Sequence, residues 1–276
     1  MKKRTFEEIN EIYQKHVNEH KTLSELSREY GFNVSYYFKK YNLETFNWWK
    51  KDLNKRRELY HAYEIKNDLE VIDSEEKAYI LGLWMSNGWV TDNEICIKIH
   101  KDDRQLIEKI RDFFAPEVPI KEVKNTVSFR LSSIKLVEQF NSYGCIKNKT
   151  YSEMHVPNIS KELIRHFIRG YFDGDGTIFM DRKYYKSNIC SICEGFLKEL
   201  QKILTENYIE SRINIEVREG KPLKDPDGKI TTTQKNMYRL YVSKQAEILK
   251  FKDFMYRNST IYLKRKFDKF PETFTE

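Results

Sequence analysis

Residues 167–176 read FIRGYFDGDG, and the fold can be worked out from this stretch. The same pattern stands 88 residues earlier, where residues 79–88 read YILGLWMSNG. At this offset Gly82 corresponds to Gly170, and Gly88 corresponds to Gly176. A repeat of this kind predicts two copies of one structural unit in the chain.

The stretch that follows each decapeptide predicts the same elements in the same order. In the first copy we expect, after the helix, a hairpin, a helix, a hairpin and a closing helix at 89–100, 102–114, 120–131 and 134–143. The second copy predicts them at 177–193, 196–208, 212–242 and 245–256. The predicted fold class is therefore α+β, a pseudo-twofold tandem repeat of α-β-β-α-β-β-α.

Small residues recur on one face of each repeat helix. Gly82 and Ser86 are four residues apart, as are Gly170 and Gly174, so each pair shares a helix face. A glycine inside a helix costs about 1 kcal/mol relative to alanine, and a close helix–helix contact would explain its presence. We therefore expect the two repeat helices to touch along these four residues.

The N-terminal region has the signals of short helices. Thr22 and Glu25 form a capping-box pattern, Gly31 is a natural helix stop, and a short basic helix is expected at 34–41. This order is typical of a helix-turn-helix, although an ordinary helical hairpin without DNA contacts remains open. The candidate DNA-binding residues of this region are Ser35, Tyr36, Lys39 and Lys40.

The predicted domain boundaries follow from these patterns. They are a helix-turn-helix segment at 1–48, a basic linker at 49–73, a first repeat at 74–150 and a second repeat at 151–276.

The composition narrows the class of protein. The chain has 49 Lys and Arg against 42 Asp and Glu, a net charge of +7, and is 39% hydrophobic, which excludes a disordered or collagen-like chain. It has no apolar run long enough for a membrane span and no apolar signal core after its basic start. We expect a cytoplasmic protein without membrane contacts, in a bacterial or phage-infected cell. Four scattered cysteines do not make a disulfide framework, and we interpret Cys190 and Cys193 as structural.

Both repeat helices resemble the LAGLIDADG motif of homing endonucleases, and 167–176 is the closer match. The resemblance covers about residues 74–270, including the flanks at 144–150, 157–158 and 262–267. A helix-turn-helix ahead of such a double repeat also resembles phage and mobile-element members of the family. The resemblance implies a saddle of hairpins on double-stranded DNA. Because the two copies differ at nearly every outward position, we expect a long asymmetric target site and a monomer.

The resemblance also implies a Mg²⁺ site at the two helix ends. Asp175 would hold the cation together with its counterpart in the first repeat, but that counterpart is Asn87, which carries no charge. Three explanations stay open: a natural loss of cleavage, a nicking or weakened enzyme, and a deliberate Asp-to-Asn change. Because the rest of the first motif is intact, a recent or engineered change is favoured over long decay.

The strands alternate apolar and polar residues, as a saddle with one wet face requires, although any solvated sheet would alternate in the same way. On the outward face, the candidate DNA-binding residues are Lys98, Arg130, Arg212, Arg218, Arg239 and Tyr241. The resemblance implies a basic residue near the scissile phosphates, for which the candidates are His100, Lys101 and Lys244.

Three functions follow as hypotheses. The first is a sequence-specific homing endonuclease, crippled or inactivated by Asn87. The second is a DNA-binding protein or regulator on the same scaffold that does not cut. The third, an unrelated helix–hairpin repeat, would lack steeply salt-dependent DNA binding.

Overall fold

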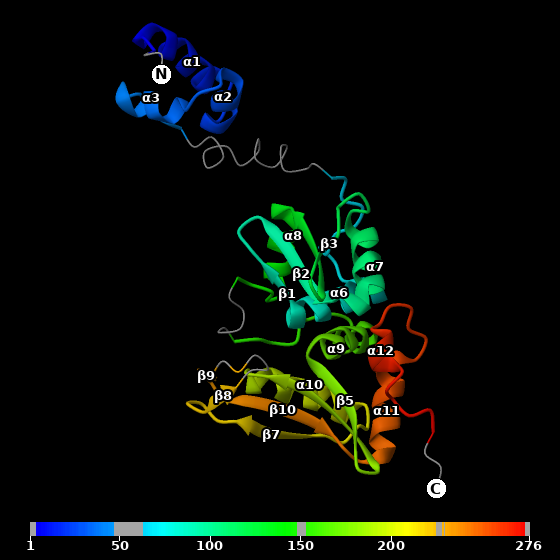
Figure 1. The fold of residues 1–276 in the computed structure, drawn as a ribbon. Helices are drawn as coiled ribbons and strands as arrows, with labels where there is room; N and C mark the ends of the chain where they lie inside the picture. The colour runs from blue at the N-terminus through cyan, green and yellow to red at the C-terminus, as the bar shows by residue number, and fades with distance from the viewer. Residues whose placement is uncertain (1–3, 47–62, 148–152, 225–227, 229, 274–276) are drawn as a thin grey trace. The chain divides into compact units, whose positions relative to one another are not determined.

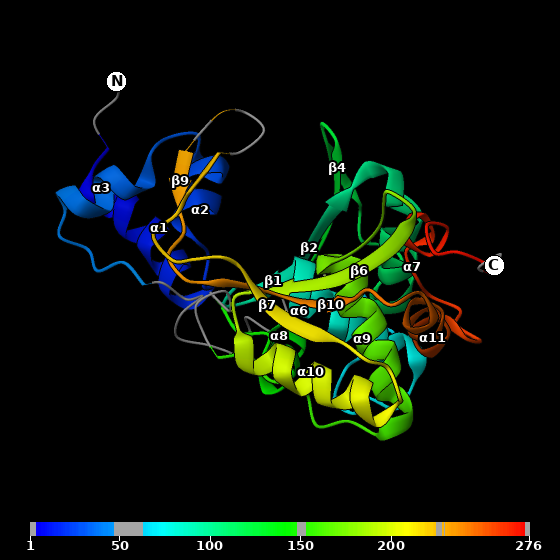
Figure 2. The ribbon, with the colours of Figure 1, turned by 90° about the horizontal axis from the view of Figure 1, so that it is seen from below.

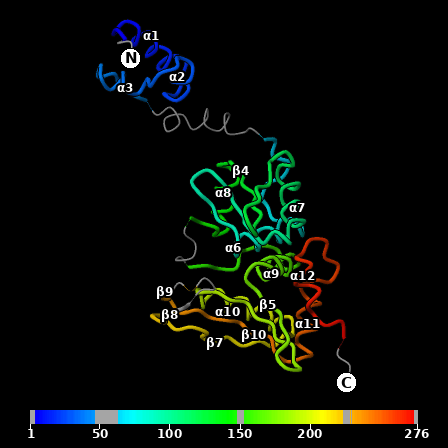
Figure 3. Tube along the Cα trace, in the orientation of Figure 1, coloured from blue at the N-terminus to red at the C-terminus, as the bar shows by residue number. Residues whose placement is uncertain are grey.

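The computed structural model describes residues 4–46, 63–147, 153–224, 228 and 230–273 (Figures 1 and 3). Contacts within the chain divide it into two units, residues 1–62 and residues 63–276, and each is described by itself. No helix among the described residues is long and apolar enough to cross a lipid bilayer.

In its described residues, 4–46, the first unit contains the helices α1 (Phe6–Asn18), α2 (Leu23–Tyr30) and α3 (Val34–Lys40). Thr22 and Glu25 form the predicted capping box at the start of α2, and Gly31 ends that helix with a φ of 70°. The helices share a small core made by Ile9, Ile12, Leu26, Val34, Tyr37 and Phe38. The opposite side of α3 exposes Ser35, Tyr36, Lys39 and Lys40.

The second unit begins earlier than predicted. Leu69 and Ile72, which we assigned to the linker, are buried in its core, and the Leu69 amide donates to Gln139 Oε1 at 2.9 Å. Both residues have charged neighbours in the sequence, so no apolar periodicity indicates that they are buried. Residues 49–62 of the predicted linker lie outside the described residues. Tyr63 and the residues that follow it belong to the second unit.

The first repeat has the predicted order of elements. These are α6 (Glu75–Asn87), β1 (Gly88–Val90), β2 (Glu94–His100), the 3₁₀-helix η1 (Lys101–Asp103), α7 (Arg104–Phe114), β3 (Lys121–Val123), β4 (Thr126–Ser132) and α8 (Ile134–Ser142). The four strands form one antiparallel sheet in the order β1-β2-β4-β3.

The second repeat follows the same plan with two additions, the strand pair β8–β9 and the short helix α12. Its elements are α9 (Lys161–Asp175), β5 (Gly176–Asp181), β6 (Tyr184–Ser191), α10 (Glu194–Glu206), β7 (Arg212–Val217), β8 (Pro222–Lys224), β9 (Ile230–Thr232), β10 (Met237–Val242), α11 (Gln245–Tyr256) and α12 (Lys264–Phe267). The sheet order is β5-β6-β10-β7, which is the order of the first sheet. The added pair β8–β9 occupies the loop expected between β7 and β10.

Together these elements form the α+β fold that the repeat predicts, with two four-stranded antiparallel sheets and a helical N-terminal region. Helices α6 and α9 lie side by side between the two repeats, and α10 runs along one face of the second sheet (Figures 1 and 2). A single hydrophobic core joins both repeats through this helix pair.

The alternation of the strands departs from the prediction at two residues. Strict alternation with Ile95 and Ile97 places Cys96 on the wet face, but Cys96 is fully buried, because its neighbours on that face, Trp89 and Arg130, pack against each other with the guanidinium 5.7 Å from the indole centroid. Strict alternation with Arg212 and Asn214 places Ile215 in the core, but Ile215 is 44% exposed. It lies on β7, the edge strand of its sheet, where less of the core is within reach.

Candidate active site at the paired helix ends

The contact between α6 and α9 is the same on both sides. A Cβ atom added to Gly82 would lie 2.0 Å from the carbonyl oxygen of Phe167, and one added to Gly170 would lie 2.0 Å from that of Tyr79. Phe167 and Tyr79 are themselves 88 residues apart, so the contact repeats about a local twofold axis. Only glycine at these two positions allows the backbones to come so close.

The C-terminal ends of the two helices also meet. A Cβ atom on Gly174 would lie 1.7 Å from Ser86 Oγ and 2.2 Å from Asn87 Oδ1, so the end of α6 packs against the residue before Asp175. Asp175 itself is exposed at the end of α9. The structure thus brings Asn87 and Asp175, which a sequence separation of 88 residues keeps apart, to neighbouring positions.

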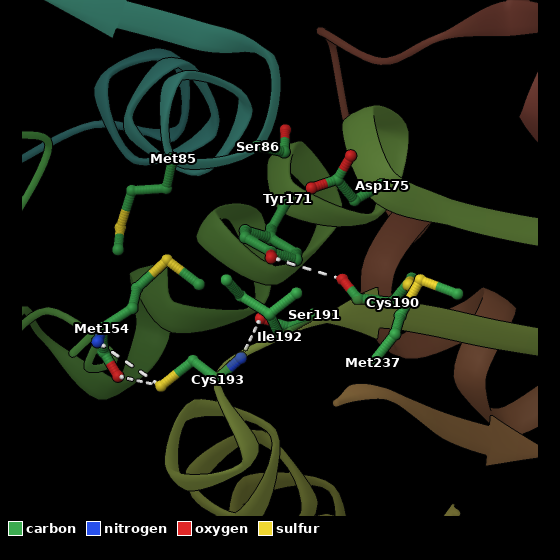
Figure 4. Close-up of a pocket in the computed structure, with 10 residues that line it drawn as sticks. All are labelled: Met85, Ser86, Met154, Tyr171, Asp175, Cys190, Ser191, Ile192, Cys193 and Met237. Atoms are coloured by element: carbon green, nitrogen blue, oxygen red, sulfur yellow. Dashed lines mark hydrogen bonds between the residues drawn. The ribbon is translucent and has the colours of Figure 1, made fainter. Parts of the chain in front are cut away.

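A small cavity of about 210 Å³ opens beside this meeting point (Figure 4). Ser86 from α6 and Asp175 from α9 both line it, and Figure 4 shows them close to each other above Tyr171. Cys190 and Cys193 line it from the other side. Cys193 is the residue before α10 rather than part of a strand, and its Sγ contacts the backbone of Met154, in keeping with a structural role.

The other carboxylate of the motif, Asp173, points into the protein. It is 3% exposed and accepts hydrogen bonds from the Tyr79 hydroxyl at 2.8 Å, the Tyr256 hydroxyl at 2.9 Å and the Leu263 amide at 2.6 Å. Burial raises the pKa of Asp173 to about 6, although these donors and Lys266 lower it in part. Asp173 therefore ties α6 and the C-terminal segment to α9 and is not available as a metal ligand.

The basic group at the end of α9 is Lys266, which was not among the predicted residues. Its ammonium donates to the carbonyl oxygens of Phe172 at 2.8 Å, Gly174 at 3.2 Å and Gly176 at 2.6 Å. A cation in this position satisfies the unpaired carbonyls of a helix C-terminus and opposes its negative dipole. Burial lowers the pKa of Lys266 to about 8, against the opposing effect of Asp173 and Asp175.

The three predicted basic residues stand at junctions between elements. Lys244 is the residue before α11 and pairs with Glu210. His100 ends β2 and accepts from the Asp102 amide, while Lys101 begins η1 and its amide donates to the Asn125 carbonyl. Of the three, only His100 makes a side-chain hydrogen bond at the start of a helix among the described residues.

Four of the ten predicted DNA-binding residues lie on or just beyond the strands of the second sheet. Arg212 and Tyr241 are paired across β7 and β10, with the guanidinium 5.9 Å from the phenol centroid. Arg239 lies on the same face, and Arg218 is exposed just beyond the end of β7. In the first sheet, Lys98 and Arg130 are exposed on neighbouring strands. The sheets therefore present basic side chains on one side of each ribbon.

The residues at the helix ends fit a hard divalent cation. Asn87 Oδ1 is buried and has no hydrogen-bond partner among the described residues, and the Asp175 carboxylate is exposed next to it. Oxygen atoms of these two kinds are suitable Mg²⁺ ligands. Within the described part of the chain, no cluster of three or more His, Cys, Asp or Glu residues forms a complete metal cage. Mg²⁺ commonly takes its remaining ligands from water and substrate phosphates.

The buried carboxylate leads to a pH prediction. The pKa of Asp173 is raised from 3.8 to about 6 in the folded protein, so the stability that its protonated form contributes is lost as the pH rises through this range. We expect the free energy of unfolding of the wild type to fall by about 2 kcal/mol relative to Asp173→Asn between pH 4 and pH 7. Urea unfolding of both proteins at unit pH steps measures this difference. Asp92→Asn is the control, because it removes an exposed carboxylate and keeps Asp173. The free energy of unfolding of the wild type relative to Asp92→Asn should not fall by this amount between pH 4 and pH 7, and an equal fall would contradict the assignment.

Comparisons with known proteins agree with this architecture. The family model described as a LAGLIDADG-like domain matches residues 162–255, from α9 to α11. The DNA-directed RNA polymerase subunit Rpo1C of Methanocaldococcus jannaschii is 32% identical over an alignment of 127 residues that covers 42% of this chain. The chain spans 14% of the length of that relative.

Solved structures with related folds include DNA-bound meganucleases. The LAGLIDADG meganuclease I-AabMI bound to uncleaved DNA is 15% identical with a TM-score of 0.46, covering 70% of this chain and 87% of that chain. Full-length DUF199/WhiA from Thermatoga maritima is 17% identical with a TM-score of 0.44, covering 72% of this chain and 61% of that chain. Residues 162–255 of this chain therefore match a LAGLIDADG-like domain, which is the part of the second repeat from α9 to α11.

Proposed function

We propose that this protein binds a long, asymmetric site on double-stranded DNA as a monomer and acts on it as a Mg²⁺-dependent homing endonuclease of reduced activity. The observation that carries the proposal is the meeting of the α6 and α9 ends. It joins an exposed carboxylate at Asp175, an unpartnered amide oxygen at Asn87 and basic sheet faces in one unit. Because the outward residues differ between the repeats, an asymmetric target is expected.

Asp175 and Asn87 are the residues that would hold the cation. When bound, Mg²⁺ supplies positive charge to the phosphodiester and lowers the pKa of a bound water. The protein contributes the position of the carboxylate. Lys266 fixes the last turn of α9 through three carbonyl contacts, so that Asp175 projects from a rigid end.

Asn87 makes the two halves of the site unequal. Its amide oxygen can ligate a cation but adds no charge, so the half-site at α6 is the weaker one. We infer a strong bias toward cutting one strand. A second candidate function, a DNA-binding protein or regulator that does not cut, rests on the same missing charge.

The N-terminal unit would add contacts beyond the saddle. Its α3 presents Ser35, Tyr36, Lys39 and Lys40 on the side that its small core leaves free. A basic helix of this kind suits the major groove, and it would lengthen the recognised site. We expect the protein to work in the cytoplasm of a bacterial or phage-infected cell, where a mobile element would encode it.

Selection from a randomised double-stranded DNA pool tests this function. The full chain should enrich a non-palindromic sequence, and its affinity should fall steeply with salt, with a log–log slope of about −0.9 for each phosphate contact. In Mg²⁺ the selected DNA should be nicked slowly by the wild type. Asp175→Asn should bind the same DNA and leave it intact.

The outcomes separate the candidates. If the wild type binds the selected DNA but never nicks it in Mg²⁺, the non-cleaving function holds. If it selects no sequence and its affinity does not depend on salt, both DNA-based functions are excluded.

A further inference from the structure

An acidic residue lies among the basic ones on the outward face of the second sheet, on its edge strand β7. Glu216, on β7, accepts a hydrogen bond from the Tyr241 hydroxyl at 2.8 Å, and its Oε1 lies 3.6 Å from Nη1 of Arg239. Both partners are on β10, the neighbouring strand. The carboxylate is 35% exposed and the guanidinium 32% exposed, so both are reachable from outside.

The position of Glu216 is fixed by its surroundings. The pairing of β7 with β10 contains a register shift between Met237 and Tyr238, opposite the place where Glu216 sits. Irregularities of this kind re-aim a side chain. Tyr241, which holds the carboxylate, is itself covered by Arg212. The Glu216 carboxylate is thus held in place by Tyr241 and Arg239 and is not a freely rotating surface charge.

A carboxylate on a surface that faces a polyanion is unfavourable unless a hydrogen-bond donor meets it. In the major groove, the donor that suits a carboxylate is the N4 amino group of cytosine. Its partner guanine offers N7 and O6, which are the two acceptors that an arginine binds through two hydrogen bonds. An adjacent guanidinium and carboxylate therefore match the full edge of one G·C pair.

We propose that Arg239 and Glu216 together read one G·C base pair, with Arg239 on guanine and Glu216 on cytosine. The proposal rests on the proposed function, since it requires DNA on this face. Other pairs fit less well. An A·T pair would put the O4 acceptor of thymine against Glu216, and a T·A pair would offer Arg239 one acceptor and a methyl group in place of two acceptors.

The test compares two substitutions by selection from the randomised duplex pool. The wild type should enrich one column in which G·C exceeds A·T by about tenfold or more. Glu216→Gln, whose amide both donates and accepts, should lower this preference by about tenfold in that column alone. Arg239→Gln should change the same column from guanine toward adenine, which glutamine binds well.

Glu194→Gln is the matched control. Glu194 begins α10, on the helix along the sheet, where it pairs with Lys198. This variant should select the wild-type motif without change, and circular dichroism melts should show all variants folded. The proposal is overturned if both Glu216→Gln and Arg239→Gln select the wild-type motif, or if they change different columns. Failure of the wild type to select any DNA would instead remove the proposed function itself.

Discussion

Replacing the amide at position 87 by a carboxylate is expected to raise double-strand cleavage of the selected DNA by at least about 100-fold. The Asn87→Asp change replaces a neutral amide by a negatively charged carboxylate at a position whose side-chain oxygen already lies against the end of α9. A metal acting as a Lewis acid contributes several kcal/mol to a reaction of this type, and each 1.36 kcal/mol is tenfold in rate. The measurement follows the nicked and linear products of a supercoiled plasmid carrying the site.

The strand that is cut tells the two half-sites apart. The wild type should nick one strand, through Asp175, and Asn87→Asp should convert the nick to a double-strand break with little change in affinity. The variant that combines Asn87→Asp with Asp175→Asn should nick the opposite strand. Asn87→Ser serves as a control that removes the amide without adding charge. If Asn87→Asp leaves both strands intact in Mg²⁺ while DNA binding is retained, position 87 is not part of a cleavage site.

The sequence was sufficient to predict the order of elements in both repeats. Because the motif recurs at an offset of 88 residues, the elements found in one repeat predict those of the other. It also predicted that Gly82 and Gly170 each contact the backbone of the opposite helix, because a glycine within a helix is unfavourable unless a close contact requires it. These inferences depend on local patterns. They succeed where one periodicity decides which face of an element is buried.

Lys266 shows where such inference stops. Its role depends on three carbonyls at the end of a helix about 90 residues earlier in the chain, and a KRK run on its own is typical of a solvated surface. The sequence indicates basic candidates at strand ends, such as His100 and Lys244, but it contains no distances between elements and so does not indicate Lys266. Leu69 was missed for a related reason, as a single anchor residue has no period.

Disrupting the helix contact gives the second large effect. We expect Gly82→Ala to lower the free energy of unfolding by about 3 kcal/mol or more, because the new methyl group would stand 2.0 Å from a backbone oxygen that cannot rotate away. Separating the helices is opposed by the bonds that cross between them. These include the ion pair of Arg169 with Glu75 at 2.7 Å and the hydrogen bond from Tyr79 to Asp173. For a unit of this size the melting temperature should fall on the order of 10 °C.

Gly195→Ala is the matched control, because this residue is a helical glycine with nothing within 4 Å of an added Cβ atom. Alanine has fewer conformations than glycine in the unfolded chain, so Gly195→Ala should stabilise the protein by about 0.4–1 kcal/mol. Gly170→Ala should be as harmful as Gly82→Ala, since each glycine meets the same backbone atoms of the other repeat. Thermal melts of the three variants, followed by circular dichroism, measure the expected fall in melting temperature for Gly82→Ala and Gly170→Ala and the expected rise for Gly195→Ala. If Gly82→Ala and Gly195→Ala shift the melting temperature in the same direction, the helices are not in backbone contact, and Asn87 and Asp175 lose the framework that brings them together.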